Sequence, residues 1–241
     1  MQWATLTLAE VGDAAVDGRV AVLPVGATEQ HGPHLATGTD SVIAERAALA
    51  AAERTGDVVL PTVAYGCSLG HTAHWPGTLS LSPGTLTALV EDVGRWVHAS
   101  GFRKLVIVNA HATNGPPCGS AILQLRHELP DLRLRFVTVA DLTPELAAEI
   151  RDDAPDFHAN DAETSLLLHF DPALVRPERA VDEPDRTVGL VFQYPVPLTT
   201  VSGVVGSPTR ATAERGAALF DAVVEALVAL LEQARAERDP L

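Results

Sequence analysis

Residues 27–40, ATEQHGPHLATGTD, place a glutamate and a histidine two positions apart, with an aspartate nine positions after the histidine. In an extended loop alternate side chains point the same way, so Glu29 and His31 can face one space. Divalent metals bind such mixtures of imidazole and carboxylate, and a carboxylate such as Asp40 can bridge two ions. The segment therefore predicts half of a metal site. The alternative is a polar surface loop in which Asp40 caps the following helix.

The segment NAHATNG (109–115) is a second polar cluster and contains His111 and Thr113. Like the first cluster, it follows an apolar run that is typical of a buried strand. The carboxyl ends of parallel strands meet at one edge of a sheet, where His111 would complete the shell of an ion. A structural or surface histidine is the alternative. Zn²⁺ and Mn²⁺ both accept nitrogen and oxygen ligands, so the ligand types leave the ion open.

Two further segments contain side chains that could act in a site. GCSLGHTAHWPGTLSL (66–81) holds His71, His74 and Trp75 in a glycine-rich loop. These three form either a substrate wall or an ordinary loop with a packed indole and solvated imidazoles. DFHANDAETS (156–165) holds His158 and Glu163 and leads into the apolar run LLLHF.

The elements that must position these residues alternate between strands and helices. Apolar runs predict strands at RVAVLPVG (19–26), DVVLPTVAYG (57–66), KLVIVNA (104–110) and LRLRFVTVA (132–140). Helical spacing and end signals predict helices at 41–56, 81–101, 120–129 and 209–238. This alternation predicts a single-domain, three-layer α/β/α fold with a mainly parallel sheet over residues 1–241.

Two of these predictions are specific enough for a structure to contradict. In the helix at 81–101, Ser82 is the expected N-cap, and one apolar stripe is assigned to the core: Leu86, Leu89, Val90, Val93, Trp96 and Val97. Residues 171–208 are rich in proline and contain β-like pieces such as TVGLVFQYP. We expect this segment to be a flap near the site.

Composition excludes several classes of partner. The 241 residues carry a net charge of −14, which repels nucleic acid and anionic membrane surfaces. No basic leader and no apolar stretch of about 20 residues is present, so we expect a cytoplasmic protein. Its cysteines, Cys67 and Cys118, are expected to be buried thiols.

Four motifs, in this order, resemble those of the creatininase (creatinine amidohydrolase) family. They are GATEQHGPHLATGTD, WPGTLSL, VNAHATN and HANDAETS, and the agreement in order and spacing covers about residues 18–170. The C-terminal pattern is also similar to the mycofactocin-maturation peptidase of this family. The resemblance implies a metal-dependent hydrolase of C–N bonds with a parallel sheet flanked by helices, assembled as a homohexamer.

The resemblance also implies roles for individual residues. The family's metal-ligand positions correspond to Glu29, His31, Asp40 and His111, with Asp40 as the bridging ligand. His158 falls on the position of a histidine used in proton transfer, and Glu163 on an acidic position close to the metals.

Two departures from creatininase itself affect the expected chemistry. Thr113 stands where creatininase has a glutamate, so either Glu163 supplies the missing ligand or the second ion is weakly held. Creatininase encloses its substrate with tryptophans, but no tryptophan lies beyond Trp96 here, which argues against creatinine as the substrate.

These observations predict hydrolysis of a small-molecule amide such as a lactam, cyclic amide or formamide. A divalent ion, Zn²⁺ first and Mn²⁺ or Fe²⁺ as alternatives, would supply hydroxide for the attack, and His158 would protonate the leaving nitrogen. His71, His74, Trp75 and Thr113 are the candidate substrate contacts. Two alternatives are a peptidase that trims a modified peptide and an inactive family member that acts as a binding subunit.

Overall fold

The computed structural model describes residues 1–240, which are built on a four-stranded parallel sheet. The strands lie in the order β2 (Val58–Val59), β1 (Ala21–Val25), β3 (Lys104–Asn109) and β4 (Arg133–Thr138). In the centre, Ala21 of β1 pairs with Leu105 of β3, and the register continues to Val25 and Asn109. The predicted parallel sheet is confirmed.

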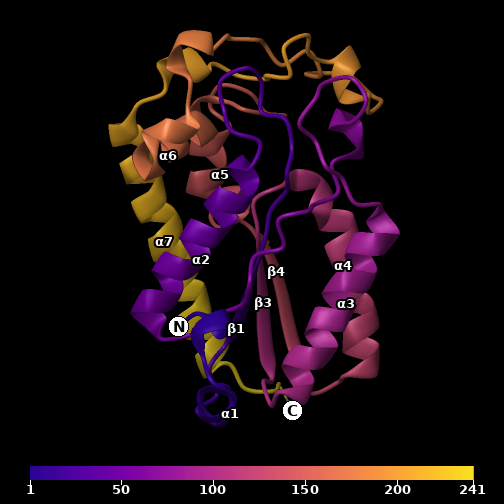
Figure 1. The fold of residues 1–241 in the computed structure, drawn as a ribbon, viewed down its shortest axis with the longest axis vertical. Coiled ribbons are helices and arrows are strands. Elements are labelled where there is room, and N and C mark those ends of the chain that lie inside the picture. Colours follow the sequence, from indigo (N-terminus) through magenta and orange to yellow (C-terminus); the bar gives the residue numbers. More distant parts are fainter. Residues whose placement is uncertain (241) are drawn as a thin grey trace.

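Helices cover both faces of this sheet (Figure 1). One face packs against α2 (Thr39–Thr55), α6 (Asp161–Phe170) and α7 (Ala213–Ala236), and the other against α3 (Pro83–Ala99) and α4 (Gly115–Glu128). The two shorter helices are α1 (Leu8–Val16) and α5 (Pro144–Ile150).

Alternate strand residues serve the two cores. Val22 and Val106 pack on the α2 side, whereas Leu23 and Ile107 pack on the α3 side. Because successive strand side chains point to opposite faces, strands that are covered on both sides must be apolar throughout. The three-layer α/β/α fold class is confirmed.

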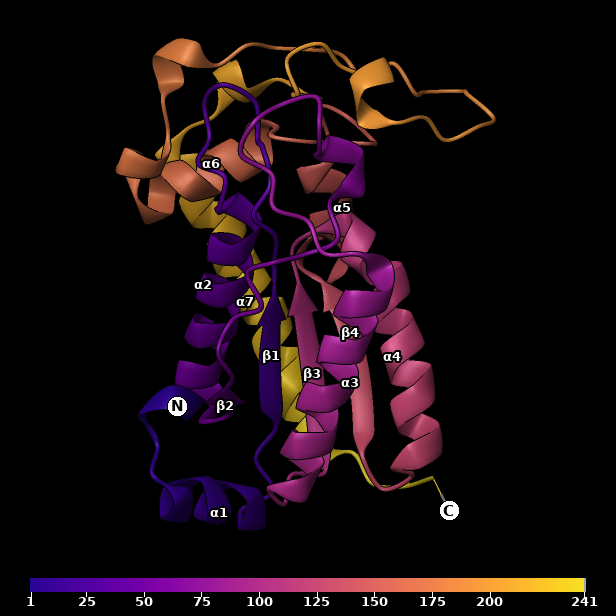
Figure 2. The same cartoon turned by 45° about the vertical axis from the view of Figure 1, so that its right-hand side comes forward.

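The strand order reverses between β1 and β3. From β1 the chain passes through α2 to β2 on one side, and from β3 it passes through α4 to β4 on the other. In open parallel sheets, ligands bind beyond the carboxyl ends of strands at such a reversal. Figure 2 shows the carboxyl ends of β1 and β3 beside each other, below a group of loops.

Two sequence predictions about regular structure are wrong in part. The strand expected over 57–66 is limited to Val58–Val59, with one isolated bridge from Val63 to Val25. The N–H of Leu60 still donates to Val22 of β1, but Pro24, which faces β2 as Val22 does, has no N–H to donate to the next step of this ladder. TVGLVFQYP forms no strand among the described residues.

The prediction that Trp96 belongs to the core is wrong. Ser82 does cap α3, and Leu86, Val90 and Val97 are buried as expected. Trp96, however, is 72% exposed because it lies at the edge of the apolar stripe, beyond the reach of the sheet. Cys67 and Cys118 are free and buried, as expected.

The segment 171–208 consists of loops and short 3₁₀ turns that cross the end of the molecule beyond the strand tips (Figure 1, orange). Buried Glu183 joins the early part of this segment to its late part, because its carboxylate accepts hydrogen bonds from the backbone N–H groups of Val201 and Ser202. Among residues 1–240, no helix combines the length and apolar content needed to cross a membrane.

Candidate metal centre

Five side chains from three distant parts of the sequence meet at the strand reversal. Glu29 and His31 follow β1, and Asp40 lies in the first turn of α2. His111 follows β3, and Glu163 lies in the first turn of α6. All five are buried. The polar residues that were expected to converge at the strand ends therefore lie together at this end of the sheet.

The position of Asp40 results from close packing of α2 on β1. A Cβ on Gly26 would lie 2.4 Å from the backbone of Ser41, so only glycine permits this approach. The Ser41 hydroxyl also donates to the carbonyl of Ala27 at 2.9 Å. The N-cap of α2 is Gly38, and no side chain caps this end, so capping by Asp40 is not its role.

The five residues form two groups that share Asp40. In one group, His111 Nε2 is 3.2 Å from Glu29 Oε2, and His111 Nδ1 is 3.3 Å from Asp40 Oδ2. In the other, His31 Nε2 is 3.2 Å from Asp40 Oδ1 and 3.9 Å from Glu163 Oε1. In each group, one nitrogen or oxygen atom from every member lies within 4.8 Å of the others. Each oxygen of Asp40 faces a different group.

Several atoms of this cluster lack partners within residues 1–240. Both carboxylate oxygens of Glu29, His31 Nε2 and Asp40 Oδ2 are buried without a hydrogen bond. Isolating buried polar and charged atoms in this way costs free energy unless something compensates. A divalent cation would compensate all of them at once, so the donor set fits a metal.

The pKa values of these residues reflect their crowding. Burial raises the pKa of Glu29 to about 6 and that of Glu163 to about 7. Burial alone would lower the pKa of His31, but the carboxylates, Asp40 foremost, raise it to about 10. Burial opposes ionisation of Asp40, yet His31 and His111 hold its pKa well below the usual range. The cluster is therefore rich in negative charge, which protons or a cation must balance.

His158 lies beside the cluster with one nitrogen free. Its backbone pairs with Val205, and its ring stacks 4.4 Å from His31 and 4.5 Å from His71. The Nε2 atom is 2.8 Å from the carbonyl oxygen of Gln30, which only accepts, so Nε2 donates the hydrogen. Nδ1 then carries a lone pair, 3.5 Å from Glu29 Oε1. Burial, together with charge on His31 and His71, lowers the pKa of His158 well below normal.

The side chain of Gln30 was missed by the sequence analysis. Its Oε1 accepts from the N–H of Gly32 at 2.9 Å, and its Nε2 donates to His71 Nδ1 at 2.9 Å and to Gly203 O at 3.4 Å. Gln30 thereby connects the end of the 171–208 segment to the stacked rings of His71 and His158. The position of Gln30 between Glu29 and His31 could have indicated a role in the site. In an alternating loop, however, its side chain is expected to point away from those of Glu29 and His31.

The four candidate substrate contacts divide into two pairs. His71 and Thr113 line the cavity above the cluster, and Thr113 Oγ1 contacts His111 Nε2 at 2.6 Å. His74 and Trp75 stack edge to face on each other at 4.5 Å and lie outside the lining of that cavity. His34, from the first motif, is buried elsewhere, with its Nε2 2.9 Å from Thr164 Oγ1.

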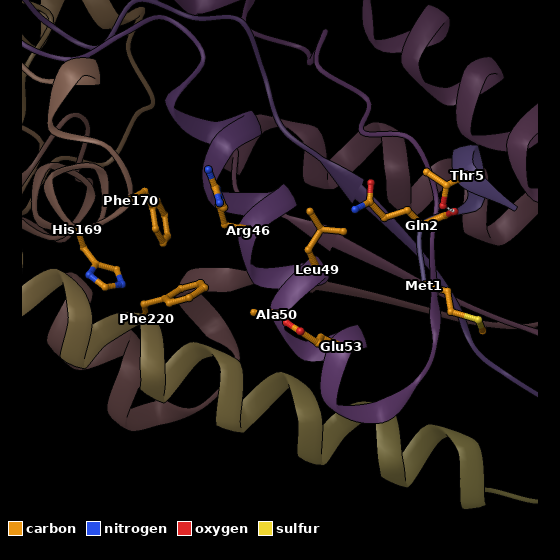
Figure 3. A pocket seen from close by; sticks show the side chains of 10 residues that line it. All are labelled: Met1, Gln2, Thr5, Arg46, Leu49, Ala50, Glu53, His169, Phe170 and Phe220. Carbon is orange, nitrogen blue, oxygen red and sulfur yellow. Dashed lines mark hydrogen bonds between the residues drawn. The ribbon is translucent and has the colours of Figure 1, made fainter.

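The cavity above the cluster has a volume of about 690 Å³. Four of the five cluster residues, all except His31, are part of its lining, together with Phe157 and residues of the 171–208 segment. Figure 3 shows a different hollow, of about 590 Å³, lined by α2 side chains such as Arg46, by Met1 and by the packed rings of Phe170 and Phe220. No cluster residue lines this second hollow.

Comparison with known proteins identifies the family of this chain. A family model described as "Creatininase: Creatinine amidohydrolase" matches residues 4–231. The creatinine amidohydrolase of Pseudomonas putida is 31% identical over 86% of this chain and 86% of its own. The mycofactocin precursor peptide peptidase of Mycolicibacterium smegmatis is 32% identical over 91% of this chain and 87% of its own. A crystal structure of creatinine amidohydrolase superimposes with a TM-score of 0.88 at 30% identity, covering 98% of each chain. The protein therefore belongs to the creatininase family of metal-dependent amidohydrolases.

Proposed function

We propose that this site hydrolyses the C–N bond of a non-standard or cyclic amide, such as a lactam, a cyclic amide or a formamide. Water adds its oxygen to the carbonyl carbon, the C–N bond breaks, and the products are a carboxylic acid and an amine. The observation that carries the proposal is the shared position of Asp40 between two ligand groups, in which both carboxylate oxygens of Glu29, His31 Nε2 and Asp40 Oδ2 are buried without a hydrogen-bond partner within residues 1–240.

We assign Glu29, Asp40 and His111 to one divalent ion, and His31, Asp40 and Glu163 to a second. The second assignment lets Glu163 supply the carboxylate that is missing at Thr113. Bound there, the ions would acidify water and polarise the amide carbonyl. We propose zinc, with manganese and iron as the alternatives; solved creatininase structures similar to this chain include one described as Zn-Zn type and one as "Creatininase Mn".

We assign proton transfer to His158. Its Nδ1 lone pair faces the cluster, while the carbonyl of Gln30 fixes the proton on Nε2. Neutral His158 accepts a proton from the attacking water at Nδ1 and returns it to the leaving nitrogen. Such positioned acid–base help is typically worth about 10²–10⁴-fold in rate.

A peptidase that trims a modified peptide is the second candidate. It is favoured by the 32% identity to the mycofactocin precursor peptide peptidase and by a cavity, about 690 Å³ in volume, that is large for a single small ring. Both candidates use the same bond cleavage and differ in the size of the substrate.

The ligand assignment is tested by counting ions in purified variants by mass spectrometry. Wild type should hold two ions per chain, Asp40→Ala almost none, and Glu163→Gln and His111→Ala about one each. Asp92→Asn, which alters an exposed carboxylate of α3, is the matched control and should retain both ions. Fewer than one ion in wild type, with no hydrolysis across an amide panel, would instead identify a non-catalytic binding subunit.

We further propose that the chain is one domain, forms a homohexamer and works in the cytoplasm, without nucleic acid or membrane partners. The hexamer rests on the family resemblance. The cytoplasmic location is supported by the two free, buried thiols, and the lack of nucleic acid or membrane partners by the net charge of −14.

A further inference from the structure

The 171–208 segment presents apolar side chains to solvent above the candidate metal centre. Val191 is 89% exposed and Phe192 is 74% exposed, and Leu190 and Tyr194 are exposed beside them. These side chains line the same cavity as Glu29, Asp40 and His111 in the cluster. Clustered apolar side chains that remain exposed beside a polar site are typical of a ligand-binding surface.

The rest of the lining adds an aromatic ring but no free positive charge. Phe157 lines the cavity, with Arg151 stacked over the ring at 5.5 Å. Arg151 is the one lysine or arginine among the lining residues that the structure describes, and its Nη1 is already paired with Asp141 at 2.9 Å. Asp156 lines the cavity as well. A substrate carboxylate at this rim would meet acidic groups and no unpaired cation.

We propose that residues 190–194 and Phe157 form an apolar subsite, which accepts a hydrocarbon or aromatic group of the amide substrate. That end of the substrate is neutral or cationic and does not carry a carboxylate. The inference rests on the proposed function, because it extends the substrate away from the candidate metal centre. A second copy of the chain could cover the same side chains, but their position on the lining of the catalytic cavity favours the substrate.

The size of the effect follows from apolar burial. Each CH₂ group removed from water strengthens association by about fourfold, and a fully buried aromatic side chain by at least about tenfold. An amide with a phenylpropyl group should therefore be hydrolysed with a kcat/KM at least about tenfold above that of acetamide. A matched amide that ends in a carboxylate should gain nothing over acetamide.

Binding provides a readout that does not depend on turnover. Hydroxamates chelate divalent metals, so acetohydroxamate and 4-phenylbutanohydroxamate can be compared by calorimetry on zinc-loaded protein. We expect the phenyl compound to bind at least about tenfold more tightly, and the monohydroxamate of glutaric acid to show no such gain. Phe192→Ala and Tyr194→Ala should each reduce the phenyl preference severalfold.

The matched control is Leu198→Ala. Leu198 is 72% exposed in the same segment but does not line the cavity, so its removal should leave both the preference and the turnover unchanged. Equal binding of the phenyl and methyl hydroxamates would overturn the subsite even if amides are hydrolysed. A phenyl preference without hydrolysis of any amide would support the subsite and reject the proposed function. A change of native mass in Phe192→Ala with an unchanged phenyl preference would assign the patch to a second copy.

Discussion

The carbonyl of Gln30 determines which nitrogen of His158 is available for chemistry. Because Nε2 must donate to that carbonyl, the lone pair of Nδ1 points toward Glu29. His158→Ala should therefore reduce kcat by about 10²–10⁴-fold while the ion content stays at the wild-type level. Steady-state kinetics and metal analysis on the same preparation check this. One possible ligand atom from each of His158, Glu29 and His31 lies within 4.8 Å of the others, so these three residues could also share an ion. Equal loss of ions and activity would therefore identify His158 as a metal ligand.

Gly203 holds the side chain of Gln30 in place. A Cβ at residue 203 would lie 2.2 Å from Gln30 Oε1, so Gly203→Ala must displace the amide that donates to His71. We expect kcat to fall by about 10- to 100-fold, because small displacements of positioned groups have effects of this size.

Gly189→Ala is the matched control for this change. Gly189 has φ +80°, close to the +78° of Gly203, but nothing lies within 4 Å of its Cβ position. Both alanine variants therefore carry the same kind of backbone strain, but only Gly203→Ala places its Cβ against another side chain. If the two variants lose activity equally, strain alone explains the loss. A Gln30→Ala/Gly203→Ala double variant should be no slower than Gln30→Ala.

The burial of His34 makes the fold sensitive to acid. Burial, assisted by the charge of His31, lowers the pKa of His34 from 6.5 to about 4. Between these pH values the unfolded chain takes up a proton that the folded chain refuses, so stability is lost as the pH falls through this window. The loss is about 3 kcal/mol at most, at 1.36 kcal/mol per pKa unit. Urea unfolding from pH 7 to pH 4 should show a shallower decline for His34→Gln than for wild type.

The sequence predicted which residues lie together at the candidate metal centre better than it predicted their individual contacts. Glu29, His31 and Asp40 were predicted from their types and spacing, because they follow a strand in an alternating loop. Glu163 depended on the family resemblance, since a glutamate in the first turn of a helix is common without any ligand. The contacts of Gln30 depend on Gly203, 173 positions away, and no local pattern contains that information.

At the scale of elements, Gly216 sets the distance between α6 and α7. A Cβ there would lie 1.9 Å from the carbonyl oxygen of Ser165, which is backbone and cannot rotate away. Gly216→Ala should destabilise the fold by about 1–3 kcal/mol, through forced separation of the two helices. Gly119→Ala in α4 has nothing within 4 Å and should instead stabilise by about 0.5–1 kcal/mol. Urea midpoints compare them, and destabilisation by both would reject the packing explanation.

Element positions followed from the sequence wherever apolar periodicity and end signals agreed. The helix at 209–238 appears as α7, Ala213–Ala236, and Ser82 caps α3. The failures had physical causes outside that pattern. Pro24 of β1 cannot donate a hydrogen bond to the second strand, and Trp96 lies at the edge of a stripe whose width depends on the packing partner. The segment at 171–208 was expected near the site, and its residues do line the cavity.

At the scale of the molecule, one sheet separates two apolar cores. The strands contribute alternate side chains to each core, so loss of one core exposes half of every central strand. The two cores should therefore unfold together, as expected for a single domain. Trp3 packs at 5.3 Å on Phe102 in the α3-side core, whereas α2, α6 and α7 contain no tryptophan.

These positions allow two probes to report on the two cores. Tryptophan fluorescence follows the α3 side, and far-UV circular dichroism follows all helices, including the 24 residues of α7 on the other side. In urea, with a chelator present so that bound ions do not add a second transition, the two probes should give the same midpoint and the same slope. If fluorescence changes at lower urea while much of the helical signal persists, the α2–α6–α7 layer is stable without its partner. The chain would then contain two folding units, and substitutions in α3 would not perturb the candidate metal centre through loss of the fold.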